Sequence, residues 1–331
     1  MQTFILRRLL IGVVLLFLLS LIVFTLLSIV PGDPAKQRCG LGCKEAQIKA
    51  IQHELGLDKS RFPINVTASP PFVEVHRNSQ YGDWLKDVLT GDLGESTYFR
   101  QPVTTAIRHR LPVTFELMVL TMFFTILIGI PFGVVSALFR NSPLDYLVRM
   151  TSIFGLSVPS FWVATLVLII PVSIWGYSPP LGRVVPLTDD PIGNLKQFLP
   201  AAGVLALGSA AGIMRLSRSS LLEVMRQDYM RTARAKGLRE QSIVLRHGLK
   251  NSLIPVVTVL GLQMAGLLAG TIFIERIFAL PGLGEYTFLE LFNKDFPVVQ
   301  SLSLYVGAVV ILLNLMVDVS YAWFDPRIRY S

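Results

Sequence analysis

The chain has 331 residues, of which 16% are charged, with a formal net charge of +8 and a mean hydropathy of +0.56. Its length alone is compatible with two soluble domains, but the charges are clustered and leave uncharged runs of roughly 20 residues, enough to cross a bilayer. These runs lack the alternation that is typical of transmembrane β-strands. The composition therefore excludes an ordinary soluble protein. It predicts an all-α, polytopic membrane protein, because backbone in a bilayer core must hydrogen-bond within its own helix.

Six apolar runs have the length of a transmembrane helix: about 9–30, 111–138, 150–174, 198–214, 252–274 and 301–323. The first run follows Arg7 and Arg8 and is longer than the apolar part of a cleaved signal peptide, so we expect it to be retained. With the amino terminus in the cytoplasm, the inner segments hold fifteen Lys and Arg residues and the two short outer loops hold four. The positive-inside rule then places both termini in the cytoplasm.

The runs divide the chain into a cytoplasmic amino terminus with the first helix (1–30), a long external loop (31–110) and a core of five helices (111–331). The external loop is too long for a plain connection, and we expect a small folded appendage in it. Cys39 and Cys43 both lie there, where a disulfide and two free thiols are both open. The surroundings offer too few ligands for a zinc site. Asn65-Val-Thr67 fits the acceptor pattern for N-glycosylation.

The segment 215–251 carries nine Lys and Arg against three Asp and Glu, which is most of the net positive charge of the chain. Apolar residues recur in steps of three or four at Leu222, Met225, Tyr229 and Ala233, which predicts one face of a helix. Gly237 interrupts this pattern, and a second short periodic piece follows over about 240–249. We therefore predict a helix, a glycine turn and a second helix on one membrane surface. Charge alone fits equally well a basic loop that only fixes the topology.

Two ionisable residues, Glu116 and Asp318, lie inside the predicted membrane spans. A carboxylate within a membrane is a candidate for cation binding or proton transfer. Glu116 lies near the outer end of its predicted helix, and Asp318 lies a few residues from the cytoplasmic end. Both can therefore reach water or an arginine, which favours a structural role.

The sequence shows no motif for chemistry of its own. It contains no Gly-Lys dipeptide and therefore no phosphate-binding P-loop. The four histidines form no metal-binding pattern, and there is no Gly-x-Ser-x-Gly element. The basic segment belongs to no recognisable nucleic-acid-binding module, whereas contact with anionic membrane lipid fits its position. An energy source must then be a gradient or a partner.

The order of residues from Asp228 to Pro255 resembles the cytoplasmic signature loop of ABC importer permeases, most closely the dipeptide, oligopeptide and nickel branch. Where the family's Glu-Ala-Ala triplet stands, this chain has Arg231-Thr-Ala233 and keeps only the last alanine. Further segments resemble the same branch: Pro31-Gly-Asp-Pro34, Leu111-Pro-Val-Thr-Phe-Glu116, Ile277-Phe-Ala-Leu-Pro-Gly-Leu-Gly284, Asp295-Phe-Pro-Val-Val-Gln300 and Asp325-Pro-Arg327.

The resemblance implies a type I ABC importer transmembrane-domain fold in a bacterial or archaeal plasma membrane. It implies a B-type permease that pairs with a second homologous permease, two cytoplasmic ATPase subunits and an external substrate-binding protein. This chain would hold no cofactor, since ATP and Mg would be bound by the partner subunits. Peptides are the leading substrate class that it implies, and nickel chelates or oligosaccharides are the alternatives.

The resemblance also assigns a coupling helix over about 228–238, which would seat in a groove on an ATPase. Gly237 permits a turn there that a β-carbon would strain, and the arginines can pair with acids on the partner. The implied coupling residues are Asp228, Tyr229, Arg231, Thr232, Ala233, Arg234, Ala235, Lys236, Gly237 and Leu238, supported by His247, Asn251 and Pro255.

Two other classes of protein compete with this interpretation. A secondary transporter or channel often shows inverted repeats and charged sites at the membrane midplane, and the sequence shows neither. A membrane scaffold without transport activity has no need of a large helical loop on one side and a glycine-rich turn on the other. Both features favour an importer subunit.

Overall fold

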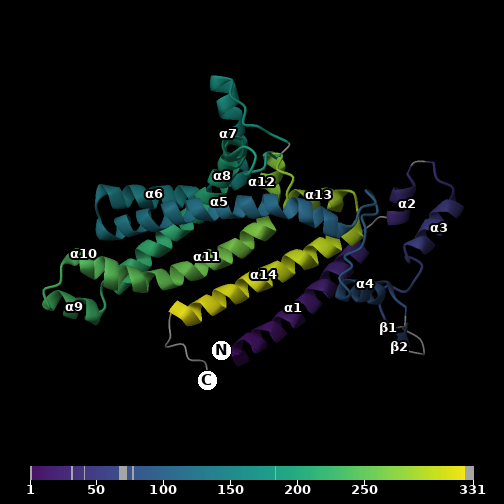
Figure 1. Cartoon of the computed structure of the whole chain (residues 1–331), viewed down its shortest axis with the longest axis horizontal. Helices are drawn as coiled ribbons and strands as arrows, with labels where there is room; N and C mark the ends of the chain where they lie inside the picture. Colours follow the sequence, from purple (N-terminus) through teal and green to yellow (C-terminus); the bar gives the residue numbers. More distant parts are fainter. Residues whose placement is uncertain are drawn as a thin grey trace. The chain divides into compact units, whose positions relative to one another are not determined.

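The structure of the protein, a computed structural model, describes residues 2–30, 33–40, 42–66, 73–76, 78–182 and 184–324 (Figure 1). Three sequence features therefore fall wholly or partly outside the described residues: Pro31-Gly32, Thr67 of the glycosylation pattern and the tail motif Asp325-Pro-Arg327. The chain divides into two compact units. Unit 1 consists of Met1–Arg8, Pro112–Glu285 and Val309–Ser331, and unit 2 consists of Leu9–Leu111 and Tyr286–Ala308.

Helices dominate the described residues, which confirms the predicted all-α class. The long helices are α1 (Gln2–Ile29), α5 (Val103–Leu138), α6 (Pro143–Ser157), α7 (Ser160–Trp175), α8 (Pro191–Val224), α11 (Lys250–Gly270) and α14 (Phe296–Phe324). The shorter helices are α2 (Pro34–Cys39), α3 (Glu45–Glu54), α4 (Gln80–Leu89), α9 (Asp228–Ala235), α10 (Glu240–Ser242), a π-helix η1 (Ile243–Leu249), α12 (Ile272–Ile277) and α13 (Leu283–Phe292). Two short strands, β1 (Ile64–Val66) and β2 (Val73–Val75), pair antiparallel with Ile64 opposite Val75.

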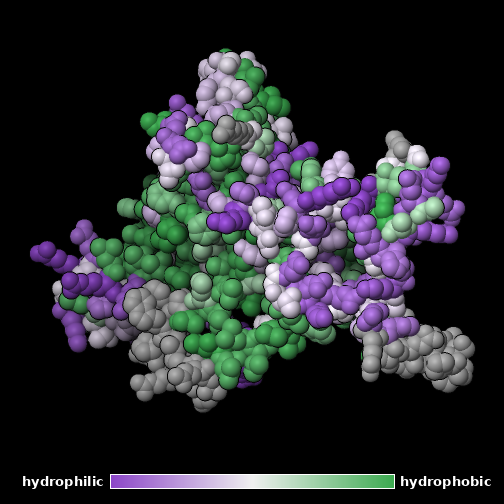
Figure 2. All heavy atoms as spheres, turned by 45° about the vertical axis from the view of Figure 1, so that its right-hand side comes forward, coloured by the Kyte–Doolittle hydropathy of each residue, from purple (hydrophilic) through white to green (hydrophobic). Residues whose placement is uncertain are grey.

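Five described helices, or six if one bent pair counts as a single span, are long and apolar enough to cross a membrane. They are α1, α5, α8, α11 with its preceding turn, and α14, and the bent pair is α6 with α7. Figure 2 shows hydrophobic side chains over the middle of unit 1 and hydrophilic side chains at the end that carries α9 and α10. This distribution is the one that a membrane-embedded bundle requires.

The predicted apolar run 150–174 does not form one straight helix. This region forms α6 and α7, which meet at an angle of 99°. Val158 has an extended backbone (φ −89°, ψ 127°) and precedes Pro159, which removes a backbone donor and disfavours helical geometry in the residue before it. The two helices have 15 and 16 residues, so each is short of the roughly 20 residues that a straight span needs.

The fourth predicted run, 198–214, forms the middle of a much longer helix, α8. This helix starts at Pro191, where the fixed φ of proline suits the first turn. The Asp190 side chain caps it by accepting hydrogen bonds from the backbone N–H groups of Ile192 and Gly193 at 3.1 and 3.0 Å. At its other end α8 runs on to Val224, so its last turns belong to the segment that the sequence assigns to a loop.

The core of unit 1 lies where α5, α7, α8 and α12 pack together. Leu117, Phe198, Ile274, Phe278 and Leu280 are buried in one hydrophobic cluster. Glycines allow closer contact at the other end of α5. A β-carbon at Gly133 would lie 2.6 Å from the carbonyl oxygen of Met214, so only glycine permits this approach of α5 to α8.

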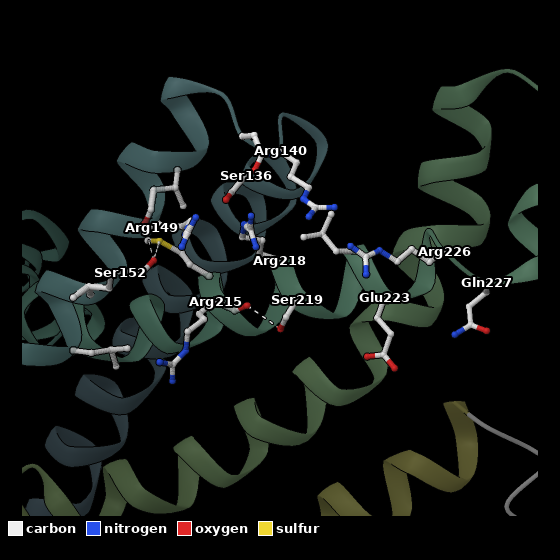
Figure 3. Close-up of a pocket in the computed structure, with 16 residues that line it drawn as sticks. Ser136, Arg140, Arg149, Ser152, Arg215, Arg218, Ser219, Glu223, Arg226 and Gln227 are labelled. Carbon is white, nitrogen blue, oxygen red and sulfur yellow. Dashed lines mark hydrogen bonds between the residues drawn. The ribbon is translucent and has the colours of Figure 1, made fainter.

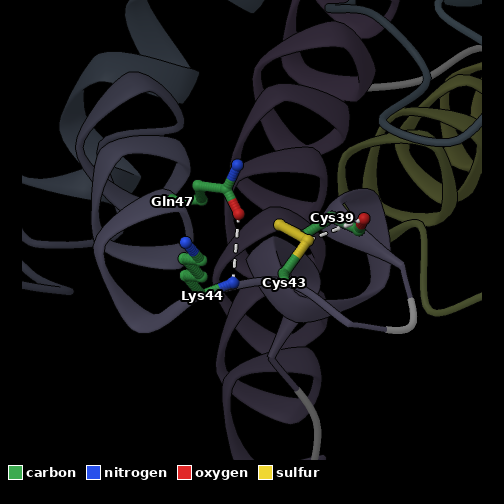
Figure 4. The surroundings of a disulfide bond; sticks show 4 residues. All are labelled: Cys39, Cys43, Lys44 and Gln47. Atoms are coloured by element: carbon green, nitrogen blue, oxygen red, sulfur yellow. Dashed lines mark hydrogen bonds between the residues drawn. A yellow bond between two sulfur atoms is a disulfide. The ribbon is translucent and has the colours of Figure 1, made fainter.

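In unit 2, aromatic side chains from different segments join α1 to α4. Phe24 of α1 contacts Phe62 and Tyr81 with ring centroids 5.3 and 5.2 Å apart, and the Tyr81 hydroxyl lies 2.9 Å from Ser20 Oγ. The same unit contains a disulfide between Cys39 and Cys43, whose Cα atoms are 5.9 Å apart (Figure 4). Of the two states that the sequence leaves open for these cysteines, the structure has the disulfide.

Candidate functional site

The basic segment 215–251 folds into the last turns of α8, the short helix α9, the turn α10 and the π-helix η1. The four apolar positions predicted to share one helix face do not do so. Leu222 and Met225 belong to the end of α8, and the chain turns at Met225–Gln227 before α9 begins. In α9 it is Met230 that lies fully buried, whereas Tyr229 is 43% exposed. The helical spacing of the apolar positions is therefore interrupted at the turn between α8 and α9.

A small hydrophobic cluster holds α9 against the rest of the segment. Met230 and Ala233 of α9 are buried against Ile243 of η1, and Met225 packs beside them. Gly248 lies beneath the same cluster, because a β-carbon there would come within 3.3 Å of the Met225 sulfur and 3.5 Å of the Met230 methyl. One side of α9 is thus anchored by a few apolar contacts.

Gly237 ends α9 in a defined way. Its φ of +77° lies in the left-handed region, where a residue with a β-carbon is strained. The Gly237 N–H donates to the Arg234 carbonyl at 2.9 Å, and the Leu238 N–H donates to the Ala233 carbonyl at 3.4 Å. This pair of bonds is the Schellman arrangement of a helix carboxyl terminus. The predicted helix 228–238 is therefore correct at its start and ends at Ala235, three residues early.

Polar contacts tie α9 to the two elements that follow it. Arg234 donates two hydrogen bonds to Glu240 at 3.2 and 2.9 Å, and this contact raises the pKa of the Arg234 guanidinium. The Asn251 amide donates to the Tyr229 hydroxyl at 3.0 Å and to the His247 carbonyl at 3.1 Å. Asn251 lies in the first turn of α11, and Pro255 follows one turn later. These hydrogen bonds connect α9 to the start of α11.

The other side of α9 is open. The exposed residues of the predicted coupling segment are Asp228, Tyr229, Arg231, Thr232, Arg234, Ala235, Lys236, Gly237 and Leu238, while Ala233 lies in the buried cluster. This face combines positive charge with the aromatic ring of Tyr229 and the side chain of Leu238, which is 44% exposed. Such a mixture of arginine, aromatic and aliphatic groups is typical of protein interfaces.

The second periodic piece, predicted over about 240–249, forms a π-helix, η1, for most of its length, and this geometry was not predicted. The π-helix spans Ile243–Leu249 and leads directly into α11. Ile243, Val244 and Gly248 are its buried residues, whereas His247 is exposed. The sequence signal that could have indicated an irregular stretch is Gly248 next to a run of helix-forming residues. Short π-helical stretches are found frequently at functional sites.

A buried ion pair fixes α6 to α8 and is a second feature that the sequence reasoning missed. Asp145, fully buried, accepts bonds from Arg218 Nε at 2.7 Å and Nη2 at 2.8 Å. It also accepts from Ser136 Oγ at 2.6 Å and from the Asn141 N–H at 2.9 Å. Both charged residues lie outside the predicted apolar runs, because those runs are shorter than the helices that form.

The two intramembrane carboxylates are separate and have different surroundings. Asp318 forms an ion pair with Arg8 at 3.2 Å, as expected for an acid near a helix end. Glu116 is half-buried on α5 and accepts a hydrogen bond from the Asn194 side chain. Across the described ranges, no group of three or more His, Cys, Asp or Glu residues is placed to hold a metal ion. Neither carboxylate is thus part of a cluster in this part of the chain.

Glu275 is a third feature that the sequence reasoning missed. Its buried carboxylate accepts hydrogen bonds from the hydroxyls of Thr114 and Thr271 and from the Glu285 N–H, each at 2.8 Å. Thr114 in turn accepts from the Leu283 N–H at 2.8 Å. The glycine-rich turn after α12 is therefore fixed to α5 through one carboxylate. A glutamate two residues before the Ile277–Gly284 motif is the available signal.

The helical bundle, the long basic segment and the anchored α9 define a transmembrane component of a transport system. The chain belongs to the family described as binding-protein-dependent transport system inner membrane component, whose model matches residues 129–330. The model of the family's amino-terminal part matches residues 1–118. The family resemblance inferred from the motifs is thereby confirmed. As a member, the chain is a permease component of the membrane that works with other subunits and is not itself an ATPase.

Relatives match this chain over its full length and theirs. A Brucella abortus (strain 2308) protein whose name assigns it to a peptide transport system is 39% identical. The dipeptide transport system permease protein DppB of Alkalihalophilus pseudofirmus is 36% identical, and the oligopeptide transport system permease protein AppB of Bacillus subtilis is 34% identical.

Among solved structures, an inward-facing conformation of the MetNI methionine ABC transporter is similar with a TM-score of 0.52 and 19% identity. The match covers 67% of this chain and 97% of that one. This likeness shows the fold, which is that of a type I ABC importer transmembrane domain, as predicted.

Proposed function

We propose that this chain is the B-type permease subunit of an ATP-driven importer of peptides. It forms the translocation pathway together with a second, homologous permease. The names of the full-length relatives support peptides as the substrate class, because they refer to peptide, dipeptide and oligopeptide transport. Peptides take precedence over nickel chelates and oligosaccharides for this reason.

Two cytoplasmic ATPase subunits and an external substrate-binding protein complete the proposed complex. The ATPases bind ATP and Mg, since this chain contains no P-loop motif. The basic segment 215–251 and both termini face the cytoplasm, as the distribution of Lys and Arg favours. The external binding protein delivers the peptide to the opposite face.

The observation that carries this proposal is the two-sided construction of α9. Its open side and the turn that follows it present Tyr229, Arg231 and Leu238 to a partner, and its anchored side packs on Ile243. An ATPase that seats α9 in a groove can pair its acids with the arginines. The ATPase groove then binds α9, which a few described contacts connect to the transmembrane bundle.

Motion of α9 reaches the bundle through identified contacts. The hydrogen bond from Asn251 to Tyr229 connects it to α11, and Ser220 Oγ of α8 donates to the Ser252 carbonyl at 2.9 Å. Closure of the ATPases on ATP moves the segment as a unit and shifts the bundle between inward-facing and outward-facing states. The chain moves its substrate without making or breaking covalent bonds.

The test is a substitution of Gly237 in the complete complex. Gly237→Leu strains the left-handed turn by about 1–2 kcal/mol, which corresponds to roughly a tenfold lower occupancy of the seated geometry. We expect normal membrane insertion and continued ATP hydrolysis, with peptide uptake reduced by about that factor. Uptake of a labelled peptide and phosphate release are measured on the same proteoliposomes.

Gly176→Leu is the matched control. Gly176 also has a left-handed backbone (φ +63°), and no heavy atom lies within 4 Å of the β-carbon position at either glycine. It ends α7 rather than α9, so we expect its uptake to stay normal. Wild-type uptake by Gly237→Leu would contradict the role of α9. Peptide uptake by this chain alone, driven by an ion gradient, would instead establish a secondary transporter.

A further inference from the structure

A cavity of about 840 Å³ opens in unit 1 between the end of α5, the middle and last turns of α6 and the last turns of α8 (Figure 3). Its lining is rich in guanidinium groups, and Glu223 is the one acidic residue among the lining residues, all of which the structure describes. The arginines of the lining are Arg140, Arg149, Arg215, Arg218 and Arg226. The cavity therefore concentrates positive charge from three helices.

Most of this charge is not neutralised within unit 1. Arg218 is paired with Asp145, and the Arg149 guanidinium lies 5.7 Å from the centre of the Tyr146 ring. For Arg140, Arg215 and Arg226, the described part of the chain provides no ion pair. Guanidinium groups gathered at one cavity repel one another, so an anion between them is electrostatically favoured. Their planar donors match phosphate oxygens in pairs.

The rest of the lining is apolar. Val148, Ile153 and Leu156 of α6 and Met214 and Leu222 of α8 line the cavity beside the arginines. The apolar surface continues outward along α6, where Leu147, Met150 and Ile153 are between 62% and 69% exposed. A small free anion would contact the arginines alone. A molecule with an anionic head group and hydrocarbon chains can contact both the arginines and the apolar surface of α6.

The cavity lies at the ends of helices that are long and apolar enough to span a membrane. Ser136 and Arg140 lie at the end of α5, and Arg215 and Arg226 lie along and just after the last turns of α8. Basic pockets between transmembrane helices on the cytoplasmic side bind anionic lipid head groups. The cytoplasmic placement of this end rests on the proposed function, in which the segment 215–251 faces the ATPases.

We propose that this cavity binds the phosphate head group of an anionic phospholipid of the cytoplasmic leaflet. Arg140, Arg215 and Arg226 hold the phosphate, and the acyl chains lie along the exposed apolar face of α6. The lipid then bridges α6 and α8 next to the Asp145–Arg218 ion pair. It joins the hairpin of α5 and α6 to the helix that leads into α9.

The test is lipid binding to the purified full-length chain. Native mass spectrometry compares retention of phosphatidylglycerol with that of phosphatidylcholine carrying the same acyl chains. The double variant Arg140→Gln, Arg215→Gln removes two cavity charges. Each basic group near an anionic lipid contributes a factor of about five, so we expect phosphatidylglycerol affinity to fall about 25-fold.

The matched control is Arg239→Gln, Arg246→Gln. These two arginines are exposed in the same basic segment, lie outside the cavity lining and carry the same total charge. We expect this variant to keep most of its phosphatidylglycerol affinity. If the double glutamine variant does not insert, the double variant Arg140→Lys, Arg215→Lys replaces it. Lysine keeps the charge but not the paired donors of arginine. The phosphatidylglycerol affinity of this variant should lie between the wild-type affinity and the roughly 25-fold lower affinity expected for the glutamine variant.

Three outcomes would overturn the proposal: equal affinity of the wild type for both lipids, equal loss of affinity in the cavity and control variants, or displacement of the lipid by an excess of inorganic phosphate. The last outcome would identify a site for a free anion. This test needs neither ATPase subunits nor substrate, so its failure is distinguishable from failure of the transport proposal. Labelling of a cysteine placed at Arg226 from each side of the membrane checks the orientation separately.

Discussion

Two buried glutamates, Glu275 and Glu290, show how differently one residue type can be used in the same chain. The solvent-exposed fraction of each is 0%. Glu275, in unit 1, has three hydrogen-bond donors at 2.8 Å. Around Glu290, in unit 2, the described residues provide no well-formed hydrogen bond to either carboxylate oxygen. The two carboxylates are therefore equally buried but differ in the number of hydrogen bonds that they accept.

The difference has an electrostatic consequence. Burial raises the pKa of Glu275 above its usual value, and the donors from Glu285, Thr271 and Thr114 counteract part of this effect. Burial and the negative charge of Asp295 raise the pKa of Glu290 to about 7, against which the Asn293 side chain and the charge of Arg110 act only partly. Glu275 is therefore a structural crosslink, whereas Glu290 is a group that titrates near neutral pH. Three substitutions sharpen this comparison.

The largest effect is expected for Gly282→Val. A β-carbon at Gly282 would overlap the Glu275 carboxyl group, and at Gly284 it would lie 3.0 Å from Glu275 Oε2. The valine must displace the carboxylate from its donors, and overpacking adds strain. We expect the free energy of unfolding to fall by about 3 kcal/mol. Thermal unfolding of the purified chain in detergent measures this loss.

Gly266→Val is the control for the Gly282 variant. Gly266 lies in α11 of the same unit, and no heavy atom lies within 4 Å of its β-carbon position. Its unfolding temperature should change little in comparison. If both variants unfold at the wild-type temperature, the carboxylate does not hold the turn in place.

A smaller effect is expected for Glu275→Gln. The amide keeps one oxygen that can accept from Thr114 and Thr271, but its NH₂ group faces the Glu285 N–H, so two donors oppose each other. An unmet buried donor costs about 1–3 kcal/mol. The unfolding temperature should therefore fall less than in Gly282→Val. A Gln variant as stable as the wild type would show that the Glu285 N–H has another acceptor.

The glycine-rich turn also shows what the sequence could and could not predict. Pro281, Gly282 and Gly284 predict a tight turn, and a turn forms there. The left-handed residue, however, is Ala279 with a φ of +50°, and Gly282 is required for the space that Glu275 fills. At Gly237 the opposite holds, because its backbone is left-handed and its surroundings are open. Local sequence shows that a glycine is needed, but only the packed neighbours show why.

The same limit explains which parts of the site were predicted. Apolar runs and charge patterning identified the helices and the segment around α9, because both depend on residues that are near in sequence. The ion pair of Asp145 with Arg218 joins residues 73 positions apart, and the Thr114–Glu275 bond joins residues 161 apart. No local pattern contains such pairs. Pro159 in the sequence marks the position of the break, but the apolar run 150–174 around it has the length of a single span.

The effect that depends on pH, and that is smallest at about pH 5, is expected for Glu290→Gln. Between the ordinary pKa of 4.5 and the folded value of about 7, the folded chain keeps a proton that the unfolded chain releases. The free energy of unfolding of the wild type therefore falls as the pH rises through this window. The Gln variant lacks this dependence, because its amide cannot ionise. We expect similar unfolding temperatures for the two proteins at about pH 5 and a more stable variant at about pH 8.

The charged groups near Glu290 also affect the pH dependence of the free energy of unfolding. Asp295 accepts from Ser96 Oγ at 2.7 Å and from the Tyr98 N–H at 3.1 Å, so its side chain is held in position. The Arg110 guanidinium lies 4.3 Å from the centre of the Tyr286 ring, and its positive charge lowers the pKa of Glu290. Glu223→Gln removes an exposed carboxylate and serves as the control, with an unchanged pH profile. A Glu290 variant that is less stable than the wild type at pH 8 would mean that the ionised carboxylate has a strong partner, and the contrast with Glu275 would disappear.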